Sequence, residues 1–541
     1  MKIWARKMTA AVLVLALSAA VLAGCTGDGG TDAGRSDANE IVVGTISESG
    51  GLDPAGVIAD TYLAYSVAAL DELLTYDKDG NIIYRAAESY EVNDERTVWT
   101  FHLRKEAVWS DGSPVTSADF RNTIERALDP ASGNGYANYL FCIENAEAIY
   151  NGEADMSTLG VETPDDNTLI FHLGTPCVYF LDLLRLPVYT PSNVQYADRA
   201  DSGWDKDPDT SLANGPYKLT EYVAQQYFVL EKNKEYWDSG SGYLDKITFR
   251  FFDSQQSMAS AYAAGELDVA PGLLDTVMTE YEGEEDLLVT DGIVTRYIYM
   301  NLNVEALQDV RVRQALNLGI NREELCKAVG QDTEPTVNLV AKRMVDKSTG
   351  EYFADGADTP FEENLELAKE LLSEAGYPDG EGFPELTYSY PSQEQDANVA
   401  QALQQQLKEN LGIDITLEAQ ERQVNYSERR AGNFELCRMN WTADFADPAT
   451  YLSMLCSNST YNCSGISDSV YDELISRADV ETDPRERSSL LHEAEQYAIG
   501  EQFYIIPLFS VRNVNLFNPE LDGIMQVPAT GALDYRQAAW K

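Results

Sequence analysis

The chain has 541 residues, which at roughly 150 residues per domain favours three or four domain-sized units. Its 39 Lys plus Arg against 89 Asp plus Glu give a formal net charge of −50 at pH 7, and a field of that sign repels nucleic acids and anionic lipids, which excludes a nucleic-acid-binding function. With 44% hydrophobic and 10% aromatic residues, the sequence can bury large cores, which excludes an acidic disordered chain.

The first 24 residues are typical of an export signal. Three basic residues precede a continuous apolar run from Met8 to Ala23, which is too short to span a bilayer comfortably. The run ends in Leu22-Ala23-Gly24-Cys25, which resembles the lipobox of bacterial lipoproteins. We therefore expect cleavage before Cys25 and lipidation of that cysteine. A signal anchor with an incidental cysteine is the weaker alternative, because small residues directly precede Cys25.

Residues 25–40 predict a flexible tether, since they are rich in Gly, Asp and Ser and have no apolar periodicity. A lipid followed by a tether places the folded body at the outer face of the cytoplasmic membrane or in a periplasm. No other apolar run in the sequence approaches the length of a membrane span.

Strands and a helix are predicted in the N-terminal part. Residues 41–46 form a short β-branched run, and residues 98–103 alternate with the period of two expected of a strand. A helix begins after residue 113, with Thr116 or Ser117 as its N-cap. Its predicted apolar face consists of Phe120, Ile124 and either Ala127 or Leu128.

Six cysteines follow Cys25, and export permits disulfides. Cys456 and Cys463 flank a polar loop and are the first expected pair, and Cys142 with Cys177 is the second. A zinc site is the competing interpretation, but there is no Cys-x-x-Cys spacing and no histidine nearby. Cys326 lies in a helical pattern and is a candidate for a free buried thiol.

The C-terminal part predicts further α/β units. A helix over about 362–375 ends at Gly376, and a second helix carries an apolar residue every four positions before it ends at Gly412. The apolar positions of the second helix are Val399, Leu403, Leu407 and Leu411. Residues 413–417 then alternate as a strand, so the folded body is predicted to be α/β throughout.

A catalytic centre finds no support in the sequence. The three histidines, His102, His172 and His492, have no partner at metal-ligand spacing. There is no Gly-x-Ser-x-Gly motif and no phosphate-binding glycine loop. Carboxylates are too abundant to nominate a glycosidase pair. We therefore expect neither an enzyme nor a cofactor.

Several segments, taken in order, resemble the peptide/nickel-type solute-binding proteins of bacterial ABC importers, family 5. They are Ala87–Arg104 with Val108–Gly112, Asn214–Tyr217, Ala264–Asp268, Asp309–Leu316 with Ile320–Glu323, and Ala375–Pro378. Each segment alone is weak, but the ordered set spans residues 41 to about 525. The resemblance implies a periplasmic-binding-protein-like α/β fold of type II, with two lobes, a hinged cleft and an extra inserted domain.

The family organisation implies boundaries for this chain. Lobe I would combine residues 41–75, 191–296 and 511–541, the inserted domain would be 76–190, and lobe II would be 297–510. A ligand would lie between the lobes and be enclosed by hinge closure. The closed form, a monomer, would then dock on ABC permease subunits whose ATPases supply the energy.

Residues 429–452 resemble the oligopeptide-binding branch of this family most closely. In similar proteins the aspartate three residues after the tryptophan pairs with the α-ammonium group of the peptide, and here that residue is Asp444, after Trp441. The arginines at the positions of Arg429 and Arg438 meet the C-terminal carboxylate in similar proteins. Thr442 and Tyr139, the latter in an aromatic patch with Tyr136, complete the candidate ligand-binding set.

The chemistry of a peptide ligand by itself also calls for a site of this kind. A zwitterionic peptide needs a counter-charge at each end, and its backbone can be satisfied as an added β-strand. Residues 439–443 are the candidate strand edge. Similar proteins can carry a cysteine at the position of Thr442, and the disulfide that it forms is not inherited here.

Each candidate residue has an alternative role. Asp444 would instead cap a helix near Asp447, although Asp447 is the preferred cap. Arg429 and Arg438 would pair with the protein's own carboxylates, and Tyr139 would simply pack. The alternative ligands are a dipeptide, a nickel chelate, haem or an oligosaccharide. A peptide-signal receptor would use the same cleft, and a surface enzyme is the alternative from a different class.

Overall fold

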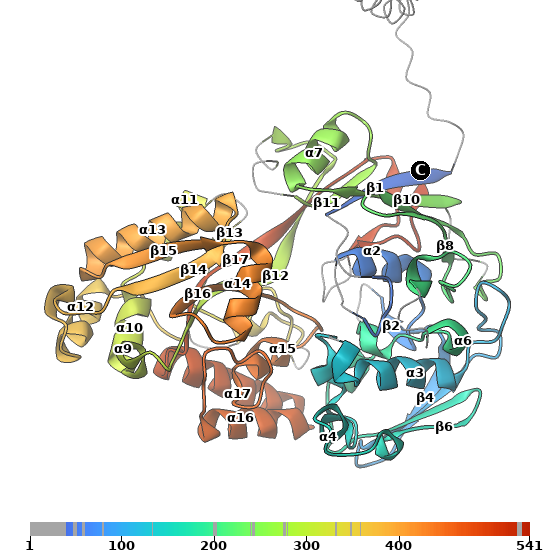
Figure 1. The fold of residues 1–541 in the computed structure, drawn as a ribbon, viewed down its shortest axis with the longest axis horizontal. Helices are drawn as coiled ribbons and strands as arrows, with labels where there is room; N and C mark the ends of the chain where they lie inside the picture. Colours follow the sequence, from blue (N-terminus) through green and yellow to red (C-terminus); the bar gives the residue numbers. More distant parts are fainter. Residues whose placement is uncertain are drawn as a thin grey trace, which may run out of the picture. The chain divides into compact units, whose positions relative to one another are not determined.

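Two long antiparallel strands, β12 (Leu287–Met300) and β17 (Ile505–Phe517), lie side by side in an 11-stranded sheet (Figure 1). Their register shifts between Thr290 and Val294. Beyond this shift β12 pairs with β16 (Leu436–Thr442), whereas the end of β17 near Phe517 pairs with β11 (Val269–Leu273). Because the other strands pair within one half of the sheet, β12 and β17 connect lobe I to lobe II.

The computed structural model describes residues 39–46, 51–56, 60–77, 81–132, 134–197, 203–238, 240, 244–273, 277, 280–329, 333–346, 349–356, 359–526 and 533–541. The predicted signal peptide, the lipidation site at Cys25 and nearly all of the predicted tether lie outside these residues. No helix in the described ranges is both long and apolar enough to cross a membrane.

Lobe I contains the part of the sheet ordered β11-β1-β10-β9-β8. The predicted strand at 41–46 is confirmed as β1 (Glu40–Ile46), which pairs in parallel with β10 and buries Ile41 and Val43. The remaining elements of lobe I are α2 (Asp60–Ala69), β2 (Leu74–Tyr76), α6 (Val194–Ala197), β8 (Tyr217–Val223), β9 (Tyr227–Lys232), β10 (Lys246–Phe252), α7 (Gln255–Ala263), β18 (Leu521–Asp522), β19 (Met525–Gln526), β20 (Leu533–Asp534) and β21 (Ala539–Trp540).

The inserted domain contains a four-stranded sheet ordered β4-β5-β7-β6. The predicted strand at 98–103 is confirmed as β5 (Val98–Leu103), and α3 (Ser117–Ala127) is capped by Thr116, whose side chain and that of Asp119 form a reciprocal capping box. The other elements are β3 (Ile82–Tyr84), β4 (Ala87–Val92), α4 (Ala146–Tyr150), β6 (Val161–Asp165), β7 (Thr168–His172), α5 (Phe180–Leu183) and short 3-10 turns, of which Ala137–Leu140 matters below.

Lobe II contains strands in the order β15-β14-β16-β12, followed by β17. The predicted helix that carries Leu403 and Leu407 is α13 (Glu394–Leu411), and it ends at Gly412 in a left-handed conformation with φ 70°. The helix predicted from about 362 begins later, at Leu365, because Asn364 caps it. The predicted strand from 413 begins at Ile415.

The elements of lobe II not yet named are α9 (Glu305–Gln308), α10 (Val310–Leu318), α11 (Arg322–Val329), β13 (Thr333–Pro335), α12 (Leu365–Glu374), β14 (Leu386–Pro391), β15 (Ile415–Gln420), α14 (Arg422–Arg430), α15 (Ala449–Leu452), α16 (Ser469–Val480) and α17 (Pro484–Glu495), which continues as a π-helical turn over Gln496–Glu501. This alternation of helices and strands confirms the predicted α/β class.

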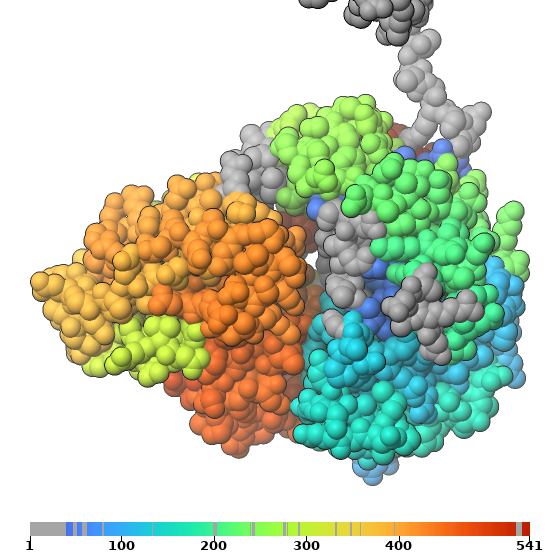
Figure 2. Space-filling model, in the orientation of Figure 1, coloured from blue at the N-terminus to red at the C-terminus, as the bar shows by residue number. Residues whose placement is uncertain are grey.

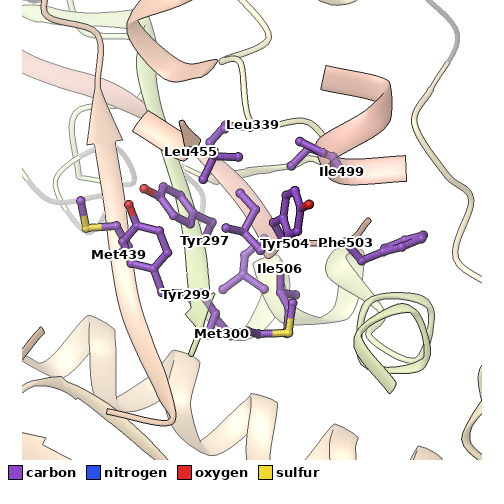
Figure 3. Packing of buried hydrophobic residues seen from close by; sticks show 14 of the residues in the cluster. Tyr297, Tyr299, Met300, Leu339, Met439, Leu455, Ile499, Phe503, Tyr504 and Ile506 are labelled. Carbon is purple, nitrogen blue, oxygen red and sulfur yellow. The ribbon is translucent and has the colours of Figure 1, made fainter. Parts of the chain in front are cut away.

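Two large hydrophobic cores organise these elements. The core of lobe II gathers Tyr297 and Tyr299 from β12, Met439 from β16 and Ile506 from β17 (Figure 3). Lobe I and the inserted domain share the other core, which also takes in Phe445 from lobe II. Residues 40–541 therefore form one compact unit, and the exact boundaries of the lobes and of the inserted domain stay a prediction.

Candidate functional site

Asp444 lies just after β16, where lobe II meets the inserted domain. The Tyr136 hydroxyl donates to Oδ1 of Asp444 at 2.9 Å, and the Tyr139 hydroxyl donates to Oδ2. Both tyrosines belong to the turn around Ala137–Leu140, about 300 positions earlier in the chain. The fold thus brings a carboxylate of one lobe between two hydroxyl donors of the other part of the molecule.

The Asp444 carboxylate has no basic partner among the residues that the structure describes. Burial raises its pKa to about 6, and the hydrogen bonds from Tyr139 and Tyr136 lower the pKa without cancelling that effect. The residue is nevertheless only half-buried, so it keeps some access to solvent. A desolvated carboxylate without a cation is costly, and an arriving ammonium group would remove that cost.

Aromatic rings surround this carboxylate. Phe445 stacks on Tyr179 of the inserted domain with 5.1 Å between ring centroids, and it meets Tyr139 edge-on at 5.7 Å. Trp441 packs edge-on against Tyr461 at 4.6 Å. Aromatic faces attract cations, so the surroundings of Asp444 suit an ammonium group as well as the carboxylate itself does.

Tyr461 is a site residue that the sequence does not single out. Its hydroxyl donates to the Gly135 carbonyl oxygen at 2.9 Å, which is a second contact between lobe II and the inserted domain. Tyr461 is one of 31 tyrosines, and it lies in the polar loop that drew attention only for its flanking cysteines. No spacing or motif would have identified it.

Asp447, the preferred helix cap, lies one residue before Pro448, which is the N-cap of α15 in the structure. Its Oδ1 accepts the backbone N–H of Ala449 at 2.9 Å, at the start of α15. Arg487 also donates twice to Asp447, each time at 2.8 Å. Because Asp447 holds the start of the helix, the side chain of Asp444 is left for its tyrosine partners.

Arg438 forms an ion pair inside the protein. Its Nε donates to Oδ1 of Asp396 at 2.9 Å, and Arg296 donates to the same oxygen at 2.8 Å. Arg438 also donates to the side chain of Asn440. The alternative that Arg438 pairs with one of the protein's own carboxylates therefore holds in this structure, although two guanidinium groups on one carboxylate leave a net positive charge.

Arg429 has a different environment at the end of α14. Its guanidinium lies over the ring of Tyr426 with 5.4 Å to the centroid, and its charge opposes the burial that raises the pKa of the Cys463 thiol. Its Nε is buried and has no hydrogen-bond partner among the described residues, and no ion pair of Arg429 occurs among them either. Of the two candidate arginines, Arg429 is the one that no carboxylate of the described chain neutralises.

One edge of β16 is only partly paired with other strands of the described chain. The N–H of Ala443 donates to the Ile293 carbonyl, which directs the backbone groups of alternate residues of β16 toward β12 and those of Asn440 and Thr442 away from it. β14 pairs with β16 only at Leu436 and Cys437. Within the described chain, the edge beyond Cys437 therefore has no strand partner.

Trp441 and Thr442, two of the candidate ligand-binding residues, lie on opposite faces of β16. Trp441 is buried, with 7% of its surface exposed, and its indole N–H donates to the Thr450 hydroxyl at 3.5 Å. Thr442 is half-buried on the opposite face of β16. Trp441 thus packs into the protein against Tyr461, whereas the side chain of Thr442 lies on the other face of the strand.

The first disulfide prediction does not match the structure. Cys456 and Cys463 are both free thiols, since the Cys463 thiol faces Arg429 while Cys456 lies near Asp472 and Asp479. Cys326, the candidate for a free buried thiol, is free and buried. Cys142 and Cys177 are also free, but each thiol shifts the pKa of the other.

The histidines have structural neighbours. His492 hydrogen-bonds the Phe353 carbonyl at 3.0 Å and stacks on that ring, and His172 lies 3.0 Å from Glu162. His102 lies 3.9 Å from Glu91. Within the described ranges, no cluster of histidine, cysteine and carboxylate side chains has the geometry of a metal site.

Comparisons with known proteins identify solute-binding and peptide-binding proteins as similar to this chain. The family model of bacterial extracellular solute-binding proteins, family 5 Middle, matches residues 81–463. The dipeptide-binding protein DppE of Bacillus subtilis is 30% identical over 84% of this chain and 83% of its own length. The periplasmic oligopeptide-binding protein OppA of Haemophilus influenzae is 30% identical over 89% of this chain and 90% of its own.

Solved structures are similar over nearly the whole chain. A periplasmic oligopeptide-binding protein of Borrelia burgdorferi superposes with a TM-score of 0.80 at 29% identity, over 93% of this chain and 100% of that chain. The murein tripeptide-binding protein MppA of Escherichia coli gives a TM-score of 0.81 at 27% identity, over 94% and 99%. The Haemophilus influenzae protein in complex with the peptide RPPGFSPFR gives 0.79 at 27%, over 93% and 99%.

Proposed function

Since the chain belongs to family 5 of the bacterial extracellular solute-binding proteins, we propose that it captures oligopeptides between its two lobes and delivers them to an ABC permease in the membrane. The family is one of binding proteins, so the chain binds and does not catalyse. On the face shown in Figure 2, a furrow separates the orange surface of lobe II from the blue and cyan surface of the N-terminal residues. The peptide would lie between these two surfaces.

The observation that carries the proposal is the state of Asp444. This carboxylate is held by Tyr136 and Tyr139, its pKa is raised to about 6, and no cation accompanies it among the described residues. The α-ammonium group of a peptide has the charge and the donors that this site lacks. A neutral sugar would leave the charge of Asp444 uncompensated, which disfavours the oligosaccharide alternative.

The peptide backbone would pair with the free edge of β16 at Asn440 and Thr442. Pairing of this kind satisfies backbone groups without reading side chains, as in other β-strand additions. The C-terminal carboxylate would meet Arg429, with added positive charge from Arg438. At about 3.3 Å per residue, Arg438 and Asp444 lie roughly 20 Å apart along the strand, which favours a ligand longer than a dipeptide.

Peptide affinity should be highest between about pH 6 and pH 8. The unliganded Asp444 carboxyl has a pKa of about 6, and an ammonium partner lowers that pKa in the complex, so protonation below pH 6 opposes binding. Above roughly pH 8 the peptide α-amino group loses its charge. Titration calorimetry from pH 5 to pH 9 should show Kd rising up to about tenfold per pH unit on either side.

Asp479 also has a pKa of about 6, because of burial, and contacts Tyr179 at 3.3 Å. Two variants distinguish the carboxyl groups. In Asp444→Asn the rise in Kd below pH 6 should disappear, whereas in Asp479→Asn it should remain. A rise in Kd below pH 6 that survives Asp444→Asn would contradict the assignment of Asp444.

Arg429→Gln should raise the Kd for free-acid peptides by about tenfold, because it removes a charge-assisted pair with the C-terminal carboxylate. The same variant should leave the Kd for C-terminally amidated peptides nearly unchanged. Arg430→Gln is the matched control, because Arg430 is exposed and donates to the Thr460 carbonyl instead. Equal losses for the acid and the amide in Arg429→Gln would show that Arg429 is structural.

A panel of solutes tests the proposal as a whole. Calorimetry of the purified full-length protein should detect tri- to hexapeptides of unrelated sequence, and should detect neither oligosaccharides, haem nor a nickel chelate. Binding of a single non-peptide solute would keep the family and overturn the peptide. A narrow response to one peptide sequence would favour a signal receptor over a nutrient importer.

We also propose that the mature chain starts at a lipidated Cys25 and is anchored at the outer face of the cytoplasmic membrane. The basic residues, the apolar run and the small residues before Cys25 support this. A mature N-terminus at another residue, read by mass spectrometry of the purified membrane fraction, would contradict it.

A further inference from the structure

Two cysteines of the inserted domain lie side by side. The two thiols influence each other's ionisation, since Cys177 lowers the pKa of the Cys142 thiol, and Cys142 adds to the effect of burial that raises the pKa of Cys177. The surrounding backbone is also joined, since the N–H of Gly174 donates to the Cys142 carbonyl at 3.0 Å and Ile143 forms a β-bridge with Leu173. The segments that carry the two thiols are therefore held together by main-chain contacts.

The other four cysteines of the folded body have different neighbours. The Cys463 thiol lies near Arg429 and Arg430. The Cys437 thiol lies near Ser389 and Asn425. Cys326 lies near Thr333, and Cys456 lies near acidic residues. Cys142 and Cys177 differ from these four because each thiol shifts the pKa of the other.

Each of the two cysteines is close in sequence to a tyrosine that meets lobe II. Tyr139 lies three residues before Cys142 and bonds Asp444, and Tyr179 lies two residues after Cys177 and stacks on Phe445. The Cys142 thiol also lies 3.8 Å from the Tyr139 carbonyl oxygen. A covalent link between the cysteines would thus fix both tyrosine-bearing segments relative to each other.

We propose that Cys142 and Cys177 form a disulfide after export, and that this disulfide braces the tyrosine wall of the binding site. The thiolate of Cys142 attacks the disulfide of an oxidising partner, which releases one partner thiol and forms a mixed disulfide. The thiolate of Cys177 then attacks Sγ of Cys142 and releases the second partner thiol. The two cysteines lose two protons and two electrons in total, and the partner disulfide gains them.

The surroundings suit this order of attack. Cys142 is half-buried, so an oxidant can reach it, whereas Cys177 is buried. Cys177 lowers the pKa of the Cys142 thiol against the opposing effect of burial, and burial raises the pKa of Cys177. The more accessible thiol is therefore also the one that ionises more readily.

Disulfide mapping of the full-length protein tests the link. The protein is taken from the envelope fraction without reductant, quenched in acid, alkylated with N-ethylmaleimide while denatured, and digested. We expect a linked peptide pair containing Cys142 and Cys177, with the other four cysteines alkylated. Alkylation of both Cys142 and Cys177, even after incubation of the native protein with oxidised glutathione, or a link from either to another cysteine, would overturn the proposal.

Thermal unfolding gives a second readout. Dithiothreitol should lower the Tm of the wild-type protein by several degrees and leave the Tm of Cys142→Ser unchanged. Cys456→Ser is the matched control and should keep the full response to dithiothreitol. A response that persists in Cys142→Ser would overturn the proposal, and if that variant does not fold, the mapping of the wild-type protein still decides.

The effect on affinity rests on the proposed function. Reduction should raise the peptide Kd at least about threefold, because it loosens the segments that carry Tyr139 and Tyr179. An unchanged Kd would overturn the bracing role. If neither form binds any peptide, the peptide assignment fails while the mapped disulfide stands, so the two failures are distinguishable.

Discussion

Asp444→Asn is expected to weaken the binding of zwitterionic oligopeptides by about 2–5 kcal/mol, which corresponds to a rise in Kd from roughly thirtyfold to several thousandfold. The substitution keeps the size of the side chain and an oxygen that accepts from Tyr136 or Tyr139. It removes only the charge that would neutralise the peptide ammonium. The loss should therefore appear in binding and hardly at all in stability.

A double-mutant cycle with the ligand isolates this interaction. N-acetylation of the peptide should weaken binding to the wild-type protein and have little further effect on Asp444→Asn, since both changes remove the same charge pair. Asp414→Asn is the matched control, because Asp414 is exposed and its carboxylate pairs with Lys408 at 2.6 Å, on the surface. Additive effects of acetylation and Asp444→Asn would show that Asp444 does not meet the peptide N-terminus.

Asp396→Ala is expected to lower the free energy of unfolding by about 3–5 kcal/mol, because it removes a buried carboxylate that pairs with the guanidinium groups of both Arg296 and Arg438. The exposed fractions of the side chains are 2% for Asp396, 8% for Arg296 and 14% for Arg438. Little water can replace the lost carboxylate at these positions. Urea unfolding of the ligand-free protein measures the loss.

The control for this prediction is Asp414→Ala, which should cost less than about 1 kcal/mol, as is usual for a surface ion pair. If Asp396→Ala costs no more than Asp414→Ala, then Asp396 does not neutralise a buried pair. The prediction for Asp396 concerns stability, whereas the prediction for Asp444 concerns binding. Measuring both the peptide Kd and the free energy of unfolding for each variant therefore distinguishes a ligand-binding role for Asp444 from a structural role for Asp396.

Local sequence patterns predicted the elements that depend on local causes. The fourfold spacing of Leu403 and Leu407 and the left-handed turn at Gly412 give α13, and the alternation of residues 98–103 gives β5. The start of α12 was placed too early because Asn364, a good N-cap, is not marked by any change in hydrophobicity. The register shift that joins the lobes in β12 has no local signal, because it depends on pairing with β17.

The sequence predicts single candidate residues of the site, such as Asp444, but it does not predict which residues they contact. The resemblance of residues 429–452 to oligopeptide-binding proteins points to Asp444, but its partners Tyr136 and Tyr139 come from a segment about 300 residues away. The pairing of Arg438 with Asp396 is equally distant in sequence, so an arginine expected to face the ligand is held by the protein itself. Spacing cannot reveal such contacts, because tertiary structure alone creates them.

Which cysteines lie close together also depends on tertiary structure. Cys456 and Cys463 were paired because they are close in sequence, and the structure places their thiols against different neighbours. Cys142 and Cys177 are farther apart in the chain, yet the β-bridge between Ile143 and Leu173 brings them close together. Sequence separation is thus a poor guide to pairing when a sheet folds the chain back on itself.

We propose that the chain is an oligopeptide carrier that binds the peptide backbone and its charged ends. Native mass spectrometry of the purified full-length protein, followed by denaturing release of what co-purifies, tests this most directly. We predict a mixture of released peptides that differ in sequence, are longer than two residues and have free α-amino groups. Release of a single non-peptide compound, or of peptides that are all blocked at the N-terminus, would contradict the account.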